Sequence, residues 1–238
     1  MKEQYSRTEL LFGEGSVERL RRARVAVFGI GGVGGAVVEA LARAGVGELF
    51  LCDSDCVSES NINRQLIALH STVGKKKTEV ARERVLDIDP DIRVTLWDRF
   101  FLPEDAAEFD FSHYDYIVDA IDTVSAKLAL IVGAFDAGVP VISCMGTGNK
   151  TDPTLFQISD IYKTSVCPLA KVMRRELRAR GIKKLKVLWS AEEPKRVMAS
   201  PDPEHEKRRA VPASCSFVPP VAGYIIGGEV IKDLLSLT

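Results

Sequence analysis

The feature that most constrains the fold is a glycine-rich segment between an apolar run and a helical one. Residues 24–29 are a short apolar run that ends in Gly29, and residues 34–44 are predicted to form a helix. Between them, Gly29, Gly31, Gly32 and Gly34 follow the spacing G-x-G-x-x-G. Glycines at this spacing permit a tight turn from a strand into a helix. The segment therefore predicts a strand–turn–helix unit.

The same alternation of strands and helices continues along the first half of the chain. Further strands are predicted at 48–53, 92–97, 114–120 and 140–144, and further helices at 75–89 and 124–137. After residue 146 the pattern changes to a strand at 154–159, a helix at 169–180, a strand at 184–189 and a helical segment at 223–237. This order predicts an α/β protein: a doubly wound, Rossmann-like, mainly parallel sheet with helices on both faces and a C-terminal α/β extension.

Composition excludes several classes of protein. The net charge is −1, so any contact with nucleic acid requires a local basic patch. No apolar run reaches the roughly 18 residues of a membrane span, and we expect no membrane association. The five cysteines show no C-x-x-C spacing, which disfavours a disulfide framework and a structural zinc site. We therefore expect a cytoplasmic protein.

The glycine turn is also a candidate phosphate site, because backbone N–H groups and a helix N-terminus favour anions. Asp53 ends the second strand, where an acid can bind ribose hydroxyls. This pattern alone leaves NAD or FAD binding open. Arg64 and Lys77, which follow, suit a triphosphate whose pyrophosphate departs. Asp122 is predicted to end the fourth strand, at the edge where such sheets bind ligands and where a carboxylate can hold Mg2+.

The segment from Asp53 to Gln65 is similar to the D-x-D-x-V-x-x-S-N-x-x-R-Q signature of the ubiquitin-activating-enzyme-like adenylating superfamily. Tyr5-Ser6-Arg7 with Leu11-Phe12-Gly13 resembles the short motif that precedes the glycine turn in that group. The resemblance implies that the four glycines cradle ATP, that Asp53 binds ribose, and that Asn61, Arg64 and Lys77 bind phosphates. It further implies that Asp122 holds Mg2+ and that Arg7 reaches the phosphates of the other subunit in a homodimer. Asp55 and Gln65, within the signature, are counted with the nucleotide site.

Motifs in the second half resemble the tRNA threonylcarbamoyladenosine dehydratase branch of that superfamily; they lie at 144–150, 152–153, 160–164, 167–171, 174–177 and 216–220. This implies a nucleotide-binding half (1–146) and a substrate and dimer half (147–238) within one domain, with a mobile loop at about 190–213. The implied reaction activates the threonine carboxylate of modified tRNA as an acyl-adenylate, which a nitrogen of the same modification attacks, with net loss of water.

The sequence also leaves other interpretations of the function open. An activator of a ubiquitin-like sulfur carrier is the alternative, disfavoured because its paired C-x-x-C motifs are missing. The resemblance also leaves open a monovalent cation and a cysteine desulfurase or sulfur-acceptor partner.

A basic stretch is the candidate tRNA contact. Lys171, Arg174 and Arg178 have the spacing of one helix face, with Arg175 beside them. The alternative is that these cations only stabilise the C-terminal end of the helix dipole.

Overall fold

A computed structural model describes residues 2–196 and 212–237. Its centre is a seven-stranded sheet in the order β3-β2-β1-β4-β5-β7-β6, in which only β6 runs antiparallel to its neighbour. The strands are β1 (Arg24–Phe28), β2 (Glu48–Cys52), β3 (Arg93–Trp97), β4 (Tyr116–Asp119), β5 (Val141–Cys144), β6 (Phe156–Asp160) and β7 (Lys186–Ser190). The predicted doubly wound α/β fold is confirmed.

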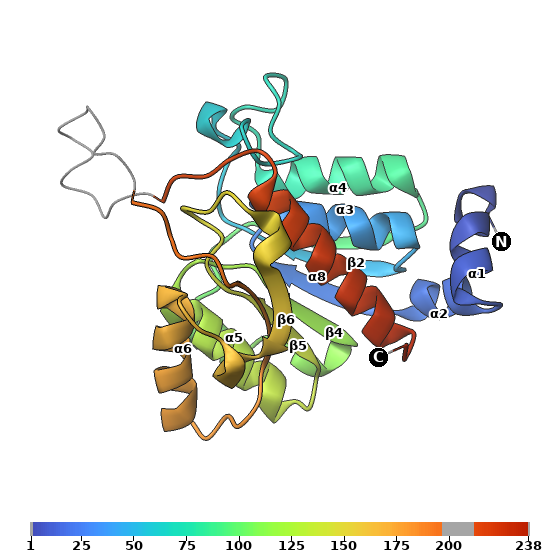
Figure 1. Ribbon diagram of the computed structural model, residues 1–238. Coiled ribbons are helices and arrows are strands. Elements are labelled where there is room, and N and C mark those ends of the chain that lie inside the picture. The colour runs from blue at the N-terminus through green and yellow to red at the C-terminus, as the bar shows by residue number, and fades with distance from the viewer. Residues whose placement is uncertain (1, 197–211, 238) are drawn as a thin grey trace.

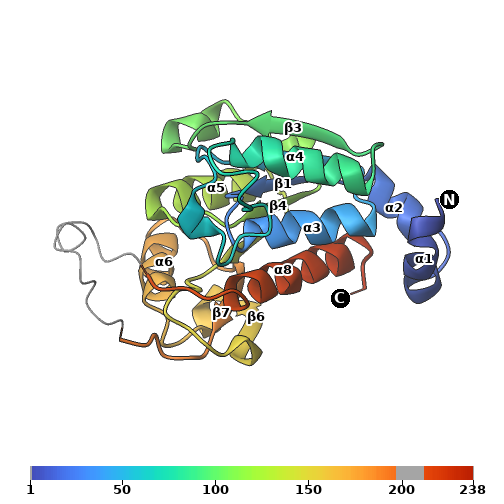
Figure 2. The ribbon, with the colours of Figure 1, turned by 90° about the horizontal axis from the view of Figure 1, so that it is seen from above.

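Helices cover both faces of this sheet (Figures 1 and 2). The α-helices are α1 (Ser6–Phe12), α2 (Ser16–Arg22), α3 (Gly34–Ala44), α4 (Lys77–Ile88), α5 (Val124–Asp136), α6 (Pro168–Ala179) and α8 (Val218–Leu234). Short 3-10 turns lie at Glu3–Tyr5, Glu59–Asn61, Pro103–Ala107, Phe111–His113, Pro153–Leu155 and Ile161–Lys163.

Alternation along the strands assigns side chains to the two faces. In β1, Val25 and Val27 pack in the core beneath α3, α4 and α8, whereas Ala26 and Phe28 pack in the core on the other face. Successive side chains of a strand point to opposite faces, so one strand serves both cores. The second face is covered by α5 and α6 and by an aromatic cluster around Phe50 and Phe109. Both faces of the central strands are therefore buried, as in other parallel sheets.

Several element boundaries differ from the predictions. Helix α8 begins at Val218 rather than 223, because Pro219 and Pro220 occupy its first turn, where a missing N–H costs nothing. Strand β4 ends at Asp119, so Asp122 lies three residues beyond it. The expected loop at 190–213 starts inside β7, where Ser190 is buried, and residues 197–211 lie outside the described part of the chain.

All five cysteines lie within the described residues and carry free thiols. Cys52 and Cys144 are buried in the core, and burial raises the pKa of each thiol to about 12. Over residues 2–196 and 212–237, no helix has the length and apolar character needed to cross a bilayer.

The N-terminal segment is fixed by one buried carboxylate at the end of α4. Asp89 accepts hydrogen bonds from the Tyr5 hydroxyl at 2.6 Å and from Arg21 at 3.0 Å, and it pairs with Lys2. Its side chain is fully buried. Burial opposes ionisation, but the hydrogen bonds from Lys2, Tyr5 and the Asp91 N–H outweigh it and lower the pKa of Asp89 to about 2. Helix α1, in contrast, buries none of its own residues.

This cluster predicts a pH-dependent stability. A carboxylate whose pKa is about 2 when folded and about 3.9 when unfolded stabilises the fold above pH 4, and that contribution disappears as the pH falls through 2. We expect Asp89→Asn to lower the urea midpoint at pH 7, with a deficit that shrinks between pH 4 and pH 2. Asp91→Asn is the matched control, because the Asp91 side chain is exposed and, within the described residues, forms an ion pair only with Lys2. Equal deficits at pH 7 and pH 2.5 would contradict the assignment.

Candidate nucleotide-binding site

The glycine turn joins β1 to α3 with no room for side chains at two positions. Gly29 has φ +88°, and a Cβ there would lie 2.6 Å from the carbonyl oxygen of Ala120. A Cβ on Gly34 would lie 1.7 Å from the carbonyl oxygen of Gly29. The turn is therefore pressed between its own helix and the segment that follows β4. The N-terminus of α3, with its favourable dipole, opens at this edge of the sheet.

Asp53 is bonded directly to this turn. It follows β2, and its Oδ2 accepts a hydrogen bond from the Ile30 N–H at 2.6 Å. Its Oδ1 accepts from the Asp55 N–H at 2.8 Å. Burial raises the pKa of Asp53 above its ordinary value, although the Lys77 ammonium and these two N–H groups act in the opposite direction.

Lys77, the first residue of α4, lies against the same carboxylates. Its side chain is 6% exposed, and its Nζ is 2.7 Å from Asp55 Oδ2 and 3.8 Å from Asp53 Oδ1. The Lys77 N–H also donates to the Asp55 carbonyl oxygen. Three segments that are distant in sequence, namely the glycine turn, the end of β2 and the start of α4, therefore meet at this point.

The polar segment after Asp55 lies across the glycine turn. Asn61 is buried and accepts the Ser58 N–H, so it holds the local backbone. The carbonyl oxygen of Arg64 would be 3.2 Å from a Cβ on Gly32, and the Arg64 guanidinium donates to Ser60 and Asn63. Asn61 and Arg64 therefore stand at the site, each engaged with neighbours in its own segment.

Gln65 is the most informative residue of this segment. It is buried, with its Nε2 3.9 Å from the position of a Cβ on Gly31. Among the described buried side chains, only its Oε1 lacks a hydrogen-bond partner. An unpaired buried amide oxygen costs free energy unless a ligand or water satisfies it. Gln65 and Gly31 thus form one wall of a polar cradle.

Asp122 is exposed in the loop after β4, and the structure places that loop against the turn, because Ile121 N lies 3.2 Å from the Cβ position of Gly29. The sequence pattern predicts Asp122 at the end of β4, whereas Asp119 occupies that position. Asp119 is fully buried there, where it pairs with the equally buried Lys127 of α5 and accepts from Ser143 of β5. The sequence does contain an indication of this pair. Asp119 is the only charged residue in the apolar stretch 116–119, and Lys127 is the only charged residue in the largely apolar stretch 124–135.

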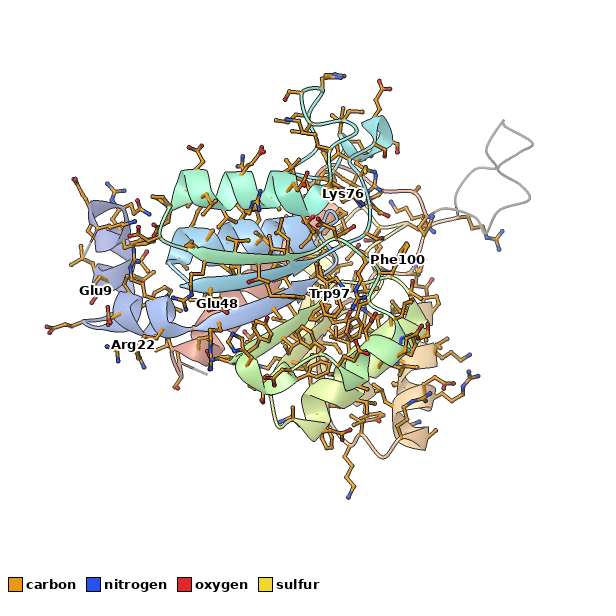
Figure 3. The ribbon with its side chains drawn as sticks, turned by 180° about the vertical axis from the view of Figure 1, so that it is seen from behind. Glu9, Arg22, Glu48, Lys76, Trp97 and Phe100 are labelled. Carbon is orange, nitrogen blue, oxygen red and sulfur yellow. The ribbon has the colours of Figure 1, made fainter. Side chains whose placement is uncertain are left out.

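Arg7 is not brought to this site within one chain. It is exposed on α1, and its helix neighbour Glu9 lies at the end of the molecule opposite Lys76 (Figure 3). The basic face of α6 is partly engaged in local contacts. Arg174 donates to the Thr164 carbonyl oxygen, Arg178 lies 4.9 Å from the Tyr162 ring centroid, and Arg175 pairs with Glu176. Lys171 is exposed.

Comparisons with known proteins agree with this geometry. The ThiF family model matches residues 5–237. The chain is 44% identical to the tRNA threonylcarbamoyladenosine dehydratase of Bacillus subtilis, over 99% of this chain and 96% of that protein. It is 32% identical to the solved structures of the Escherichia coli tRNA N6-threonylcarbamoyladenosine dehydratase in complex with AMP (TM-score 0.90) and with ATP (TM-score 0.87). Each alignment covers 99% of this chain and 95% of that one.

Two adjacent glycines of the turn test its packing. Gly34→Ala places a methyl group on the Gly29 carbonyl oxygen, and we expect a loss of at least about 2 kcal/mol in the free energy of unfolding. Gly35→Ala meets nothing within 4 Å and favours the helix, so we expect a gain of about 0.5–1 kcal/mol. Urea denaturation of both variants measures the difference, and equal stabilities would refute the described turn.

Proposed function

Because this chain belongs to the ThiF family, we propose that it is an ATP-dependent dehydratase acting on tRNA that carries N6-threonylcarbamoyladenosine. The observation that carries the proposal is the convergence of four segments on one glycine turn. They contribute Asp53, Arg64, Lys77 and Asp122. A turn with both cations and carboxylates suits a metal-bound triphosphate better than a dinucleotide.

The residues present fit ATP. The cradle at Gly31 has room that a Cβ would fill, and the buried Gln65 Oε1 offers an unused acceptor beside it. Lys77 and Arg64 supply positive charge for the phosphates. We assign Asn61 to the phosphates as well, and Asp53 to the ribose. Asp55 holds Lys77 at 2.7 Å, so it orients the lysine.

The residues also fit Mg2+, which binds through one or two carboxylates together with phosphates and water. The described residues contain no cluster of three or more His, Cys, Asp or Glu side chains that could form a protein cage. We assign Asp122, an exposed carboxylate at the turn, as the protein ligand. When bound, the metal would neutralise charge on the phosphates. A monovalent cation and a sulfur-transfer partner stay expectations drawn from the resemblance alone.

In the proposed reaction, an oxygen of the threonine carboxylate attacks the α-phosphorus of ATP, and pyrophosphate leaves. A nitrogen of the same modification then attacks the acyl carbon, and AMP departs with the carboxylate oxygen. The net change is removal of one water from the nucleoside, balanced by conversion of ATP into AMP and pyrophosphate. Ring closure within one molecule has a large effective-molarity advantage. The main tasks of the chain are therefore to orient the two reactants and to stabilise charge on pyrophosphate through Arg64 and Lys77.

The alternative, activation of a ubiquitin-like sulfur carrier, is not favoured, because the near-full-length relatives are dehydratases of modified tRNA. For tRNA contact we propose the α6 face formed by Lys171, Arg174, Arg175 and Arg178. Lys171, Arg175 and Arg178 are the exposed members of this face. We propose a cytoplasmic location, consistent with the five free thiols.

Incubation with ATP, Mg2+ and modified tRNA, followed by mass spectrometry of the nucleosides, tests the function. We expect loss of one water from the modified nucleoside and release of AMP. Asp122→Ala is expected to slow turnover by about 100-fold or more, equivalent to about 2.7 kcal/mol in the barrier, without lowering stability. Asp136→Ala, a change of the last residue of α5, is the control. A wild-type protein that binds NAD more tightly than ATP and leaves the nucleoside unchanged would reject the proposal.

We further propose that the enzyme is a homodimer in which Arg7 acts on the partner's ATP. The α1 helix buries no residue within its own chain, and Leu10 and Leu11 on it are 86% and 76% exposed. Apolar side chains exposed side by side favour a protein interface. Glu9, which shares helix α1 with Arg7, lies at the end of the molecule opposite Lys76 (Figure 3). We therefore expect Arg7 to reach a phosphate only on a second subunit. A guanidinium supplied in this way stabilises charge on the departing group.

Mixing two inactive variants tests the shared site. Arg7→Ala and Asp122→Ala should each be inactive alone, whereas a mixed dimer regains one site with Arg7 from one chain and Asp122 from the other. After subunit exchange at equal concentrations, half of the dimers are mixed, each with one of two sites intact, so we expect about a quarter of wild-type activity. Native mass spectrometry verifies the exchange. Activity that stays at the level of the single variants despite verified exchange would reject the role of Arg7 in trans.

A further inference from the structure

A buried ion pair lies at the end of the central strand of the sheet, next to the proposed nucleotide site but not part of it. Asp119 ends β4 and Lys127 lies in the second turn of α5; both side chains are 0% exposed. The distance between Lys127 Nζ and Asp119 Oδ2 is 2.9 Å. None of the proposed nucleotide contacts uses either residue.

The ammonium of Lys127 makes a complete set of contacts. Its Nζ lies 2.9 Å from Asp119 Oδ2, 2.9 Å from the Ile121 carbonyl oxygen and 2.9 Å from the Cys144 carbonyl oxygen. An ammonium has three N–H donors, so each donor has one acceptor. The acceptors come from β4, from the loop that leaves β4 and from the end of β5. Lys127 therefore joins two strand ends to one loop.

Stability alone is a poor explanation for this arrangement. Burying two charges costs much of what their attraction returns, and an apolar pair of similar volume often serves the fold equally well. The effect specific to Lys127 is on the backbone of Ile121. The Ile121 carbonyl oxygen accepts from Lys127 and the Ile121 N–H donates to Asp119 Oδ1 at 3.2 Å, so both backbone polar groups of this residue are held by the pair.

The fixed loop is the one that carries Asp122. Its Ala120 carbonyl oxygen and Ile121 nitrogen lie 2.6 Å and 3.2 Å from where a Cβ on Gly29 would be. Among the described residues, the exposed Asp122 side chain has only a 3.4 Å contact with its neighbour Thr123, so its own contacts do not fix its direction. The direction of Asp122 is set by the backbone before it.

We infer that Lys127 is a positioning residue, which holds the Ala120–Ile121 backbone against Gly29 so that Asp122 faces the phosphates. This inference rests on the proposed function insofar as Asp122 is the magnesium ligand. The effect on the loop itself does not depend on any ligand.

The test uses Lys127→Met together with the double variant Lys127→Met/Asp119→Asn, which removes both buried charges and is expected to fold. Lys186→Met is the matched control, since Lys186 is also paired with carboxylates, those of Glu229 and Asp233. Lys186 is the first residue of β7, so it lies at the amino ends of the parallel strands, away from the proposed site. Hydrogen exchange of the Ile121 amide is measured in the ligand-free proteins. The Mg2+ concentration for half-maximal ATP–pyrophosphate exchange with modified tRNA is measured beside it.

We expect the double variant to exchange the Ile121 amide at least about tenfold faster and to need about tenfold more Mg2+. The control should change neither quantity. An unchanged Ile121 amide with unchanged Mg2+ dependence would overturn the inference. Failure of the double variant to fold would overturn it as well, because the pair would then serve the sheet rather than the loop. If the wild type shows no pyrophosphate exchange, the proposed function fails, and the Ile121 amide still decides the role of Lys127.

Discussion

The architecture of the site depends on one contact, between the carbonyl oxygen of Gly29 and the α-carbon of Gly34. A Cβ on Gly34 would lie 1.7 Å from that oxygen, so the helix can follow the strand this closely only with glycine. The close approach brings the N-terminus of α3 to the carboxyl edge of the sheet, where β2 and β4 also end. Asp53, bonded to the Ile30 N–H, and the loop that bears Asp122 then meet the same turn.

Two lysine–carboxylate pairs near that turn differ in solvent access, and the difference separates their roles. Lys77 pairs with Asp55, whose side chain is 57% exposed, so a phosphate can compete for the lysine at modest desolvation cost. Lys127 and Asp119 are closed to solvent, and exchanging one partner would leave the other charge buried and unpaired. The first pair is therefore suited to binding and the second to holding backbone in place.

The two edges of the sheet carry different parts of the proposed enzyme. The carboxyl edge holds the proposed nucleotide site. Helix α1 lies at the other end of the molecule (Figures 1 and 3), and Asp89 bonds to Lys2 and Tyr5 just before it. That anchor fixes the base of α1 while the helix itself projects with its leucines exposed. A single chain therefore presents Arg7 away from its own glycine turn, which is the reason for the proposal that a second copy supplies it.

The sequence by itself determined the fold class, the strand and helix order, and the glycine turn, because each depends on local patterns of apolar residues and on glycine spacing. It also identified the residues around the turn through a resemblance. Only the tertiary structure decided which acid ends β4, since Asp119 and Asp122 look alike until burial distinguishes them. The Asp119–Lys127 pair and the Tyr5–Asp89 anchor join residues 8 and 84 positions apart. The sequence could not predict their partners, because contacts between separate elements depend on how the sheet and helices pack.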